Sequence, residues 1–147
     1  MTPRWLDDEQ QRAWRAFLDA VQVLQRGLEA QLQDEADMPH GYYELLVRLS
    51  EAPDRRLRMS ALAEAAVSSR SRLSHAVAQL EQRGWVRRVA CPEDKRGQLA
   101  VLTDEGFAAL TAAAPGHVEA VRRLLVDRLT PAQLRQLRSI SEAITAV

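Results

Sequence analysis

Residues 85–103 interrupt a chain in which the apolar residues otherwise have the spacing of amphipathic helices. Apolar residues recur at three- and four-residue steps over residues 14–32, 42–49 and 134–147, which is the period of a helix with one apolar face. After Gly84 the pattern alternates over residues 85–90 and 99–103, as is typical of two strands joined by a polar turn. The chain is therefore predicted to be mainly helical with one small β-hairpin.

Capping residues and turn residues predict where several helices begin and end. Asp7 or Asp8 is suited to cap the first long helix, Ser60 a short helix over residues 61–66, and Ser69 a helix over residues 70–83. Gly84 stands where a helix C-terminus favours a residue with positive φ.

Two prolines divide the C-terminal third of the chain. Helical spacing returns at Asp104, but Pro115 and Gly116 lie inside this stretch and predict either a kink or two separate helices. Thr130 followed by Pro131 predicts a capped start for a last amphipathic helix.

Length and composition narrow the class of protein. The 147 residues suit one ordinary domain, and no apolar run approaches the ~18 residues of a membrane span. The N-terminal residues lack the apolar segment of a secretory signal, and Cys91 is the only cysteine, so an internal disulfide is excluded. We expect a cytoplasmic protein that is not associated with a membrane.

Charge is unevenly distributed along the chain. Residues 1–54 have 5 Arg and 11 acidic residues, whereas residues 55–100 have 10 basic and 4 acidic residues, although the formal net charge of the whole chain is zero. A basic segment in a neutral protein favours a localised anion-binding face. Charge complementarity within the fold is the alternative interpretation.

The middle third has the parts of a winged helix-turn-helix in order. A capped helix, a glycine stop, a strand, a basic polar tip and a returning strand follow one another. A helix that enters a major groove about 12 Å wide must present polar side chains outward, and an arginine there can pair with guanine. The helix N-terminus also attracts a phosphate. The polar outward positions of the predicted helix are Arg70, Ser71, Arg72, Ser74, His75, Gln79 and Gln82.

Residues 57–106 resemble the multiple antibiotic resistance regulator (MarR) family of bacterial transcription factors. The tip Asp-x-Arg-Gly followed by Leu-Thr and a further glycine is the most distinctive part. One departure is that the turn over residues 66–69 lacks the glycine often found there, which leaves the start of the recognition helix open. The matching segments are Leu62-Ala63, Ser69-Arg-Ser-Arg-Leu-Ser-His75, Leu80-Glu81, Gly84-Trp-Val-Arg-Arg88, Asp94-Lys-Arg96-Gly97 and Leu102-Thr103-Asp104-x-Gly106.

The resemblance implies a sequence-specific regulator of transcription, most often a repressor, that binds a palindromic double-stranded DNA operator as a homodimer. It places the reading of the major groove on residues 70–75. It places Arg96 in the minor groove with Asp94 orienting it, while Lys95, Arg87 and Arg88 face phosphates. The full set of predicted DNA-binding residues is Ser69, Arg70, Ser71, Arg72, Ser74, His75, Arg87, Arg88, Asp94, Lys95, Arg96 and Gly97.

The same resemblance organises the chain into three parts. Residues 1–52 and 104–147 correspond to the N- and C-terminal dimerisation helices, and residues 53–103 to the winged helix-turn-helix DNA-binding domain. The apolar stripes of the first and last helices would be exposed in a monomer, so they are the expected dimer surface. The alternative is that both stripes pack within one chain.

Many members of this family release DNA when a small aromatic acid binds between the dimerisation and DNA-binding parts. Aromatic side chains would hold the ring, and Arg48 or His40 would hold the carboxylate. Core packing with polar tips is the alternative for most of this set. The candidate effector-binding residues are Trp14, Phe17, His40, Tyr42, Tyr43 and Arg48.

Other classes of site find little support in the sequence. Cys91 invites an oxidant-sensing role, and an inert, partly buried thiol is the alternative. No catalytic constellation or phosphate-binding loop is recognisable, so we predict no enzyme and no cofactor. The three histidines lack ligand spacing, so no metal site is predicted either. The main alternative is a helical protein-interaction module without specific DNA binding. The cluster of basic residues in the wing argues against this alternative, because protein interaction alone does not require it.

Overall fold

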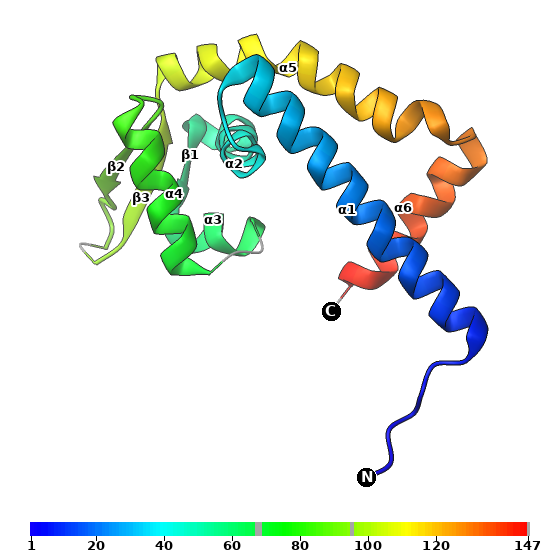
Figure 1. Cartoon of the computed structure of the whole chain (residues 1–147). Helices are drawn as coiled ribbons and strands as arrows, with labels where there is room; N and C mark the ends of the chain where they lie inside the picture. The colour runs from blue at the N-terminus through cyan, green and yellow to red at the C-terminus, as the bar shows by residue number, and fades with distance from the viewer. Residues whose placement is uncertain (67–68, 95, 147) are drawn as a thin grey trace. The chain divides into compact units, whose positions relative to one another are not determined.

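The computed structural model describes residues 1–66, 69–94 and 96–146. It confirms a mainly helical chain with a small sheet (Figure 1). Short 3-10 helices cover Pro53–Arg55 and Val126–Arg128. The helices are α1 (Asp8–Ala36), α2 (His40–Glu51), α3 (Met59–Ala65), α4 (Arg70–Gln82), α5 (Asp104–Leu124) and α6 (Pro131–Thr145). The strands are β1 (Arg56–Arg58), β2 (Val86–Ala90) and β3 (Gln98–Leu102).

The chain forms two compact units. The central unit is Leu32–Gly116, and the terminal unit is Met1–Gln31 together with His117–Val147. Helices α1 and α5 each continue from one unit into the other. Within the described residues, no helix combines the length and the apolar character required to cross a membrane.

Reciprocal side-chain caps begin the first and the last helix. The backbone N–H of Gln10 donates to Asp7 Oδ1 at 2.8 Å, and the Asp7 N–H donates to Gln10 Oε1 at 3.0 Å. Thr130 and Gln133 repeat this arrangement at the start of α6, with Pro131 in the first turn. Both caps satisfy N–H groups that have no partner within the helix, as the sequence predicted.

The predicted cap at Ser60 is wrong. Helix α3 begins at Met59, because Arg58 is still in extended conformation as the last residue of β1 and thus takes the N-cap position without a side-chain hydrogen bond. A strand that leads directly into a helix leaves no separate capping residue.

Of the two alternatives predicted at Pro115, a kink or two separate helices, the structure excludes the second, because α5 is continuous from Asp104 to Leu124. Proline removes the hydrogen bond to the carbonyl of Thr111. Both residues are exposed, so water can satisfy that carbonyl.

The sheet has three antiparallel strands in the order β1-β3-β2. The predicted hairpin pairs Val86 with Leu102 at its base and Ala90 with Gln98 near its tip. Strand β1, which the sequence did not predict, pairs Arg56 with Val101. This third strand holds the hairpin against the helices of the central unit.

The core of the central unit combines the apolar faces of its helices with one face of the sheet. Leu46 and Leu49 from α2, Leu62 from α3, and Val77 and Leu80 from α4 are all fully buried. Burial of a leucine side chain contributes about 2 kcal/mol, so this cluster supplies much of the stability of the unit.

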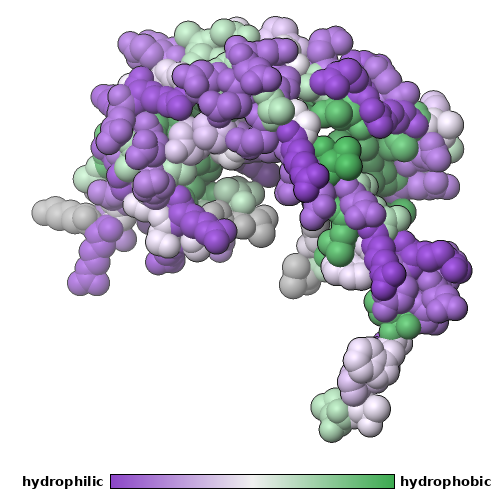
Figure 2. Space-filling view, in the orientation of Figure 1, coloured by the Kyte–Doolittle hydropathy of each residue, from purple (hydrophilic) through white to green (hydrophobic). Residues whose placement is uncertain are grey.

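Apolar side chains remain exposed on the terminal unit (Figure 2). On α1, Trp14 and Phe17 retain 51% and 45% of their surface, and on α6 Ile140 and Ile144 retain 56% and 62%. Side chains of this size are normally covered in a soluble protein when they are grouped together.

The buried Tyr43 predicts how stability changes at high pH. Burial raises the pKa of its phenol above the ordinary value near 10, and the charge of Glu44 raises it further. A raised pKa in the folded state stabilises the neutral form, so this contribution is complete below about pH 10 and is lost as pH rises through the folded pKa. We therefore expect the free energy of unfolding to fall above about pH 10.

Urea denaturation at about pH 8 and about pH 11 measures this effect. Tyr43→Phe should reduce the fall, whereas the neighbouring Tyr42→Phe should leave it unchanged. An equal pH dependence in the wild type and in Tyr43→Phe would contradict the assignment.

Candidate nucleic-acid interface

Helix α4 is the candidate recognition helix, and its start is determined locally. The hydroxyl of Ser69 accepts the backbone N–H of Arg72 at 3.2 Å, which confirms Ser69 as the N-cap. Leu73, Val77 and Leu80 face the core. The outward residues of the N-terminal half are therefore polar: Arg70, Ser71, Arg72 and His75 are exposed, and Ser74 is half-buried.

The end of α4 directs the chain into the wing. Gly84 has φ of 78°, which an L side chain rarely adopts. The N–H of Trp85 donates to the carbonyl of Leu80 at 3.0 Å, and that of Gly84 to Glu81 at 2.9 Å. These are the two hydrogen bonds of a Schellman motif, so the predicted glycine stop is confirmed.

Thr103 joins the base of the wing to α5. Its hydroxyl donates to the carbonyl of Gly84 at 2.6 Å and accepts the N–H of Gly106 at 3.0 Å. Its own N–H donates to the carbonyl of Trp85 at 3.0 Å. The Leu-Thr-Asp-x-Gly segment therefore caps α5 and anchors the turn between α4 and β2.

The tip of the wing is a compact turn. The carboxylate of Asp94 accepts the backbone N–H of Arg96 at 3.0 Å, and the Asp94 carbonyl accepts the N–H of Gly97 at 3.0 Å. The turn is closed by the Cys91 N–H, which donates to the Gly97 carbonyl at 3.0 Å. These bonds leave the Arg96 side chain exposed at the tip. Lys95 lies outside the described residues.

The two wing arginines on β2 have different surroundings. Arg87 is exposed. Arg88 is half-buried: its Nε donates to Glu81 Oε1 at 2.7 Å, and its Nη1 donates to the hydroxyl of Ser74 at 3.2 Å. The Arg88 guanidinium therefore connects the wing to the recognition helix, and its charge is compensated by Glu81.

Arg83 fixes the other end of the recognition helix. Its Nη1 donates to the carbonyl of Asp37 at 2.8 Å, in the loop between α1 and α2. Its guanidinium also lies 5.0 Å from the ring centroid of Trp85 and 5.6 Å from that of Tyr42. A cation over two aromatic rings adds to the hydrogen bond, so both ends of α4 are held in place.

A basic groove of about 430 Å³ lies between α3, α4 and the wing. It brings together Arg70 and Ser74 with Asp94, Arg96 and Gly97 of the wing tip, all of which belong to the predicted DNA-binding set. Arg58 was missed because the sequence did not predict β1. The alternation Arg-Leu-Arg at 56–58 is too short to indicate a strand in the sequence. The five lining residues outside the predicted set are Arg58, Met59, Ser60, Leu73 and Gln98. The groove is lined by Arg58, Met59, Ser60, Arg70, Leu73, Ser74, Arg88, Asp94, Arg96, Gly97 and Gln98.

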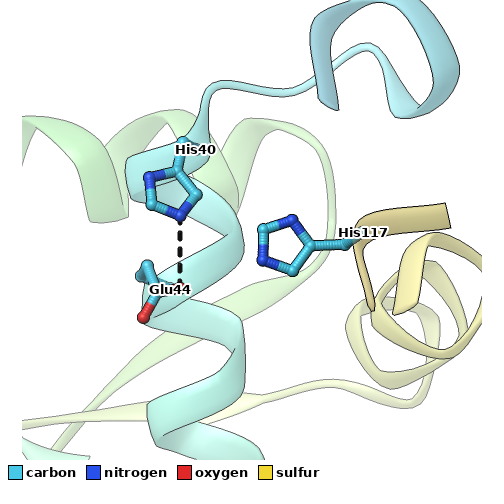
Figure 3. Close-up of side chains that lie close together, drawn as sticks. All are labelled: His40, Glu44 and His117. Atoms are coloured by element: carbon cyan, nitrogen blue, oxygen red, sulfur yellow. Dashed lines mark ion pairs between the residues drawn. The ribbon is translucent and has the colours of Figure 1, made fainter. Parts of the chain in front are cut away.

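A second cavity of about 450 Å³ lies between α2 and the helix-turn-helix. Tyr42 and Arg48, two of the predicted effector residues, line it together with Arg72 of the recognition helix. Glu44 also lines the cavity, and its Oε1 lies 3.3 Å from Nε2 of His40, one turn earlier on α2 (Figure 3). The polar and aromatic lining of this cavity therefore combines the ring of Tyr42, the two cations of Arg48 and Arg72, and the carboxylate of Glu44.

The remaining predicted ligand residues and Cys91 have other surroundings. Tyr43 is buried in the core and does not line the second cavity. Trp14 and Phe17 are exposed on the terminal unit. The Cys91 side chain is buried at the base of the wing tip, with 6% of its surface exposed.

The helix pair α3–α4, the three-stranded sheet and the projecting hairpin define a winged helix-turn-helix protein. The family model of the MarR family matches residues 39–97, which covers α2, α3, α4 and the wing through its tip.

Solved structures and characterised relatives support this assignment along most of the chain. Sco3205 from Streptomyces coelicolor, a MarR family transcriptional regulator in complex with DNA, is 56% identical with a TM-score of 0.94, covering 97% of this chain and 89% of that one. AbsC, from the same organism and family, is 42% identical with a TM-score of 0.91, covering 97% and 95%. The transcriptional regulator HosA of Escherichia coli O111:H- is 34% identical over 101 residues, 69% of this chain and 73% of HosA.

The chain belongs to the MarR family of transcriptional regulators. This membership agrees with the resemblance found in residues 57–106. It also agrees with the prediction that the protein is a regulator and not an enzyme.

Proposed function

We propose that this protein binds a specific double-stranded DNA operator through α4 and the wing, and that it represses transcription from that site. The observation that carries the proposal is the basic groove, where Arg70 from the recognition helix and Arg96 from the wing tip project from two different elements. Both side chains are exposed, and neither forms a hydrogen bond or an ion pair with another described residue.

The surroundings of the groove suit DNA. The outward residues of α4 provide hydrogen-bond donors for base edges in a major groove, and a wing arginine suits a narrow minor groove. Arg88, paired with Glu81, acts in this proposal by keeping the wing and α4 at one spacing, whereas the family resemblance implied that it faces a phosphate. Sco3205, 56% identical to this chain, is described in complex with DNA.

The proposed DNA-binding form is a homodimer. The exposed apolar side chains of α1 and α6 support a surface that a second copy covers (Figure 2). A two-fold dimer presents two recognition helices about 34–36 Å apart, one turn of DNA, so its operator is palindromic. In this proposal residues 1–52 and 104–147 form the dimer, and residues 53–103 bind DNA.

A small aromatic acid is the proposed releasing ligand, and the second cavity supports it. Tyr42 provides a ring face and Arg48 a cation for the carboxylate. Arg72 lines the same cavity and belongs to the predicted DNA-reading set. A ligand that binds more tightly to the DNA-free state shifts the population away from the complex.

Fluorescence anisotropy with two duplexes tests the proposal. One duplex carries the best palindrome upstream of the gene for this protein, and the other carries its scrambled sequence. We expect at least about 1,000-fold tighter binding to the palindrome and a steep dependence on salt. Equal weak binding to both would contradict specific recognition, and no binding at low salt would favour a protein-interaction module.

Arg72→Ala is expected to relax base preference. The side chain of Arg72 is exposed in the first turn of α4, where an arginine discriminates guanine by about 1–3 kcal/mol. Competition binding with operators altered at single positions measures this change. Arg87→Ala is the matched control, because Arg87 is exposed on β2 and is assigned to a phosphate. It should weaken all duplexes alike and reduce the salt slope. Equal effects of the two changes on every duplex would contradict these roles.

A further inference from the structure

Arg58 occupies a position between the recognition helix and the wing. It is the last residue of β1 and the N-cap of α3, with φ −61° and ψ 144°. Its strand partner on β3 is Leu99. Alternation along β1 turns Leu57 inward and leaves Arg56 and Arg58 exposed. The Arg58 side chain is thus presented on the outer surface, beside the basic groove.

The guanidinium of Arg58 reaches the backbone of the wing tip. A Cβ atom added to Gly97 would lie 3.5 Å from Nη1 of Arg58, which is ordinary van der Waals contact. Arg58, Arg70 and Arg96 line one groove, although they come from β1, from α4 and from the wing tip. Three separate elements therefore direct an arginine at the same space.

The charge of Arg58 is not compensated by a described residue. No hydrogen bond or ion pair joins its side chain to any residue within 1–66, 69–94 or 96–146. Arg88, in the same groove, is instead paired with Glu81 at 2.7 Å. The acidic side chain that lines the groove is Asp94, which accepts the backbone N–H of Arg96. An anion in the groove therefore meets more positive than negative charge.

The geometry of double-stranded DNA indicates which anion would bind in the groove. Where a recognition helix lies in a major groove and a wing enters the adjacent minor groove, the sugar-phosphate backbone passes between them. Side chains located between α4 and the wing tip therefore face phosphates and not base edges. Arg58 has this location.

We propose that Arg58 is a further DNA-contacting residue, which binds a backbone phosphate between the major groove read by α4 and the minor groove entered by the wing. The inference rests on the proposed DNA-binding function. It adds β1 to the elements that contact DNA. A guanidinium suits this role because its planar donors bind phosphate oxygens in pairs.

The test measures operator affinity at several salt concentrations for the full-length protein and three variants. Arg58→Ala should weaken binding about tenfold, as expected for loss of a hydrogen bond to a charged group. It should also reduce the slope of log K against log salt by about 0.9 for each copy of Arg58 that contacts DNA. Arg58→Lys should retain most of the salt slope, because it keeps the charge.

Arg56→Ala is the matched control. Arg56 is on the same strand, is equally an exposed arginine, and does not line the groove. Its loss should change affinity less than about twofold, as usual for a solvated surface charge. Thermal unfolding of each variant checks that the fold is retained.

Three results would overturn the proposal while leaving the DNA-binding function intact. The first is wild-type affinity and salt slope in Arg58→Ala. The second is weaker binding with an unchanged salt slope, which would assign Arg58 to holding the wing. The third is an equal loss in Arg56→Ala, which would indicate a general effect of charge. Failure of the wild type to prefer its operator would instead contradict the proposed function itself.

Discussion

Gly106→Ala is expected to prevent folding or to lower the free energy of unfolding by about 3 kcal/mol or more. A Cβ atom at this position would lie 2.1 Å from the carbonyl oxygen of Trp85 and 2.8 Å from Cδ1 of Leu102. The Trp85 backbone cannot easily move away, because its N–H donates to Leu80 and its carbonyl accepts the N–H of Thr103. Relief of the clash would therefore displace the start of α5 from the base of the wing.

Urea denaturation measures this loss, with Gly41→Ala as the control. Gly41 is also near the start of a helix, α2, but a Cβ atom there would meet nothing within 4 Å. Alanine has the higher helix propensity, so this variant should be unchanged or more stable by up to about 1 kcal/mol. Similar stability of the two variants would contradict the close packing of Gly106 on Trp85.

Arg96→Ala is expected to weaken operator binding about 10- to 100-fold, which corresponds to about 1.4–2.7 kcal/mol, without a change in thermal stability. The turn at the wing tip is held by backbone bonds and by the Asp94 carboxylate, so loss of the Arg96 side chain leaves it intact. An exposed arginine at this place suits the negative potential of a narrow minor groove.

Two further variants separate this role from a general effect of charge. Arg56→Ala removes an equally exposed arginine that lies outside both the groove and the proposed dimer segments, and it should change operator affinity less than about twofold. Asp94→Ala removes a negative charge beside the groove, which should strengthen DNA binding if charge alone matters. If Asp94 orients Arg96, affinity should fall instead. Unchanged affinity in Arg96→Ala would contradict the role of the wing tip.

Signals within a few residues were sufficient to predict most of the winged helix-turn-helix. The Ser69 cap, the Gly84 stop and the alternating strands all depend on local hydrogen bonds or on periodicity, so they can be predicted from the sequence. Strand β1 was missed because three residues are too few to show a period. It becomes a strand only by pairing with β3, more than 40 residues later in the chain.

The candidate DNA interface also has features that short-range contacts determine and features that depend on the tertiary structure. Neighbouring residues determine the polar outer face of α4 and the turn that exposes Arg96. Whether an arginine remains available to an anion depends on residues distant in sequence. Arg87 and Arg88 are adjacent in the chain, yet Arg88 alone meets Glu81 and Ser74 on α4.

The sequence by itself thus determined the caps at Asp7, Ser69 and Thr130, the place of the hairpin after α4 and the basic character of the middle third, because each depends on composition or on short-range contacts. Only the tertiary structure decided that Arg58 joins Arg70 and Arg96 around one groove, while Arg88 is committed to Glu81. The physical reason is that electrostatic pairing depends on distances in space, and packing of the sheet against α3 and α4 sets those distances.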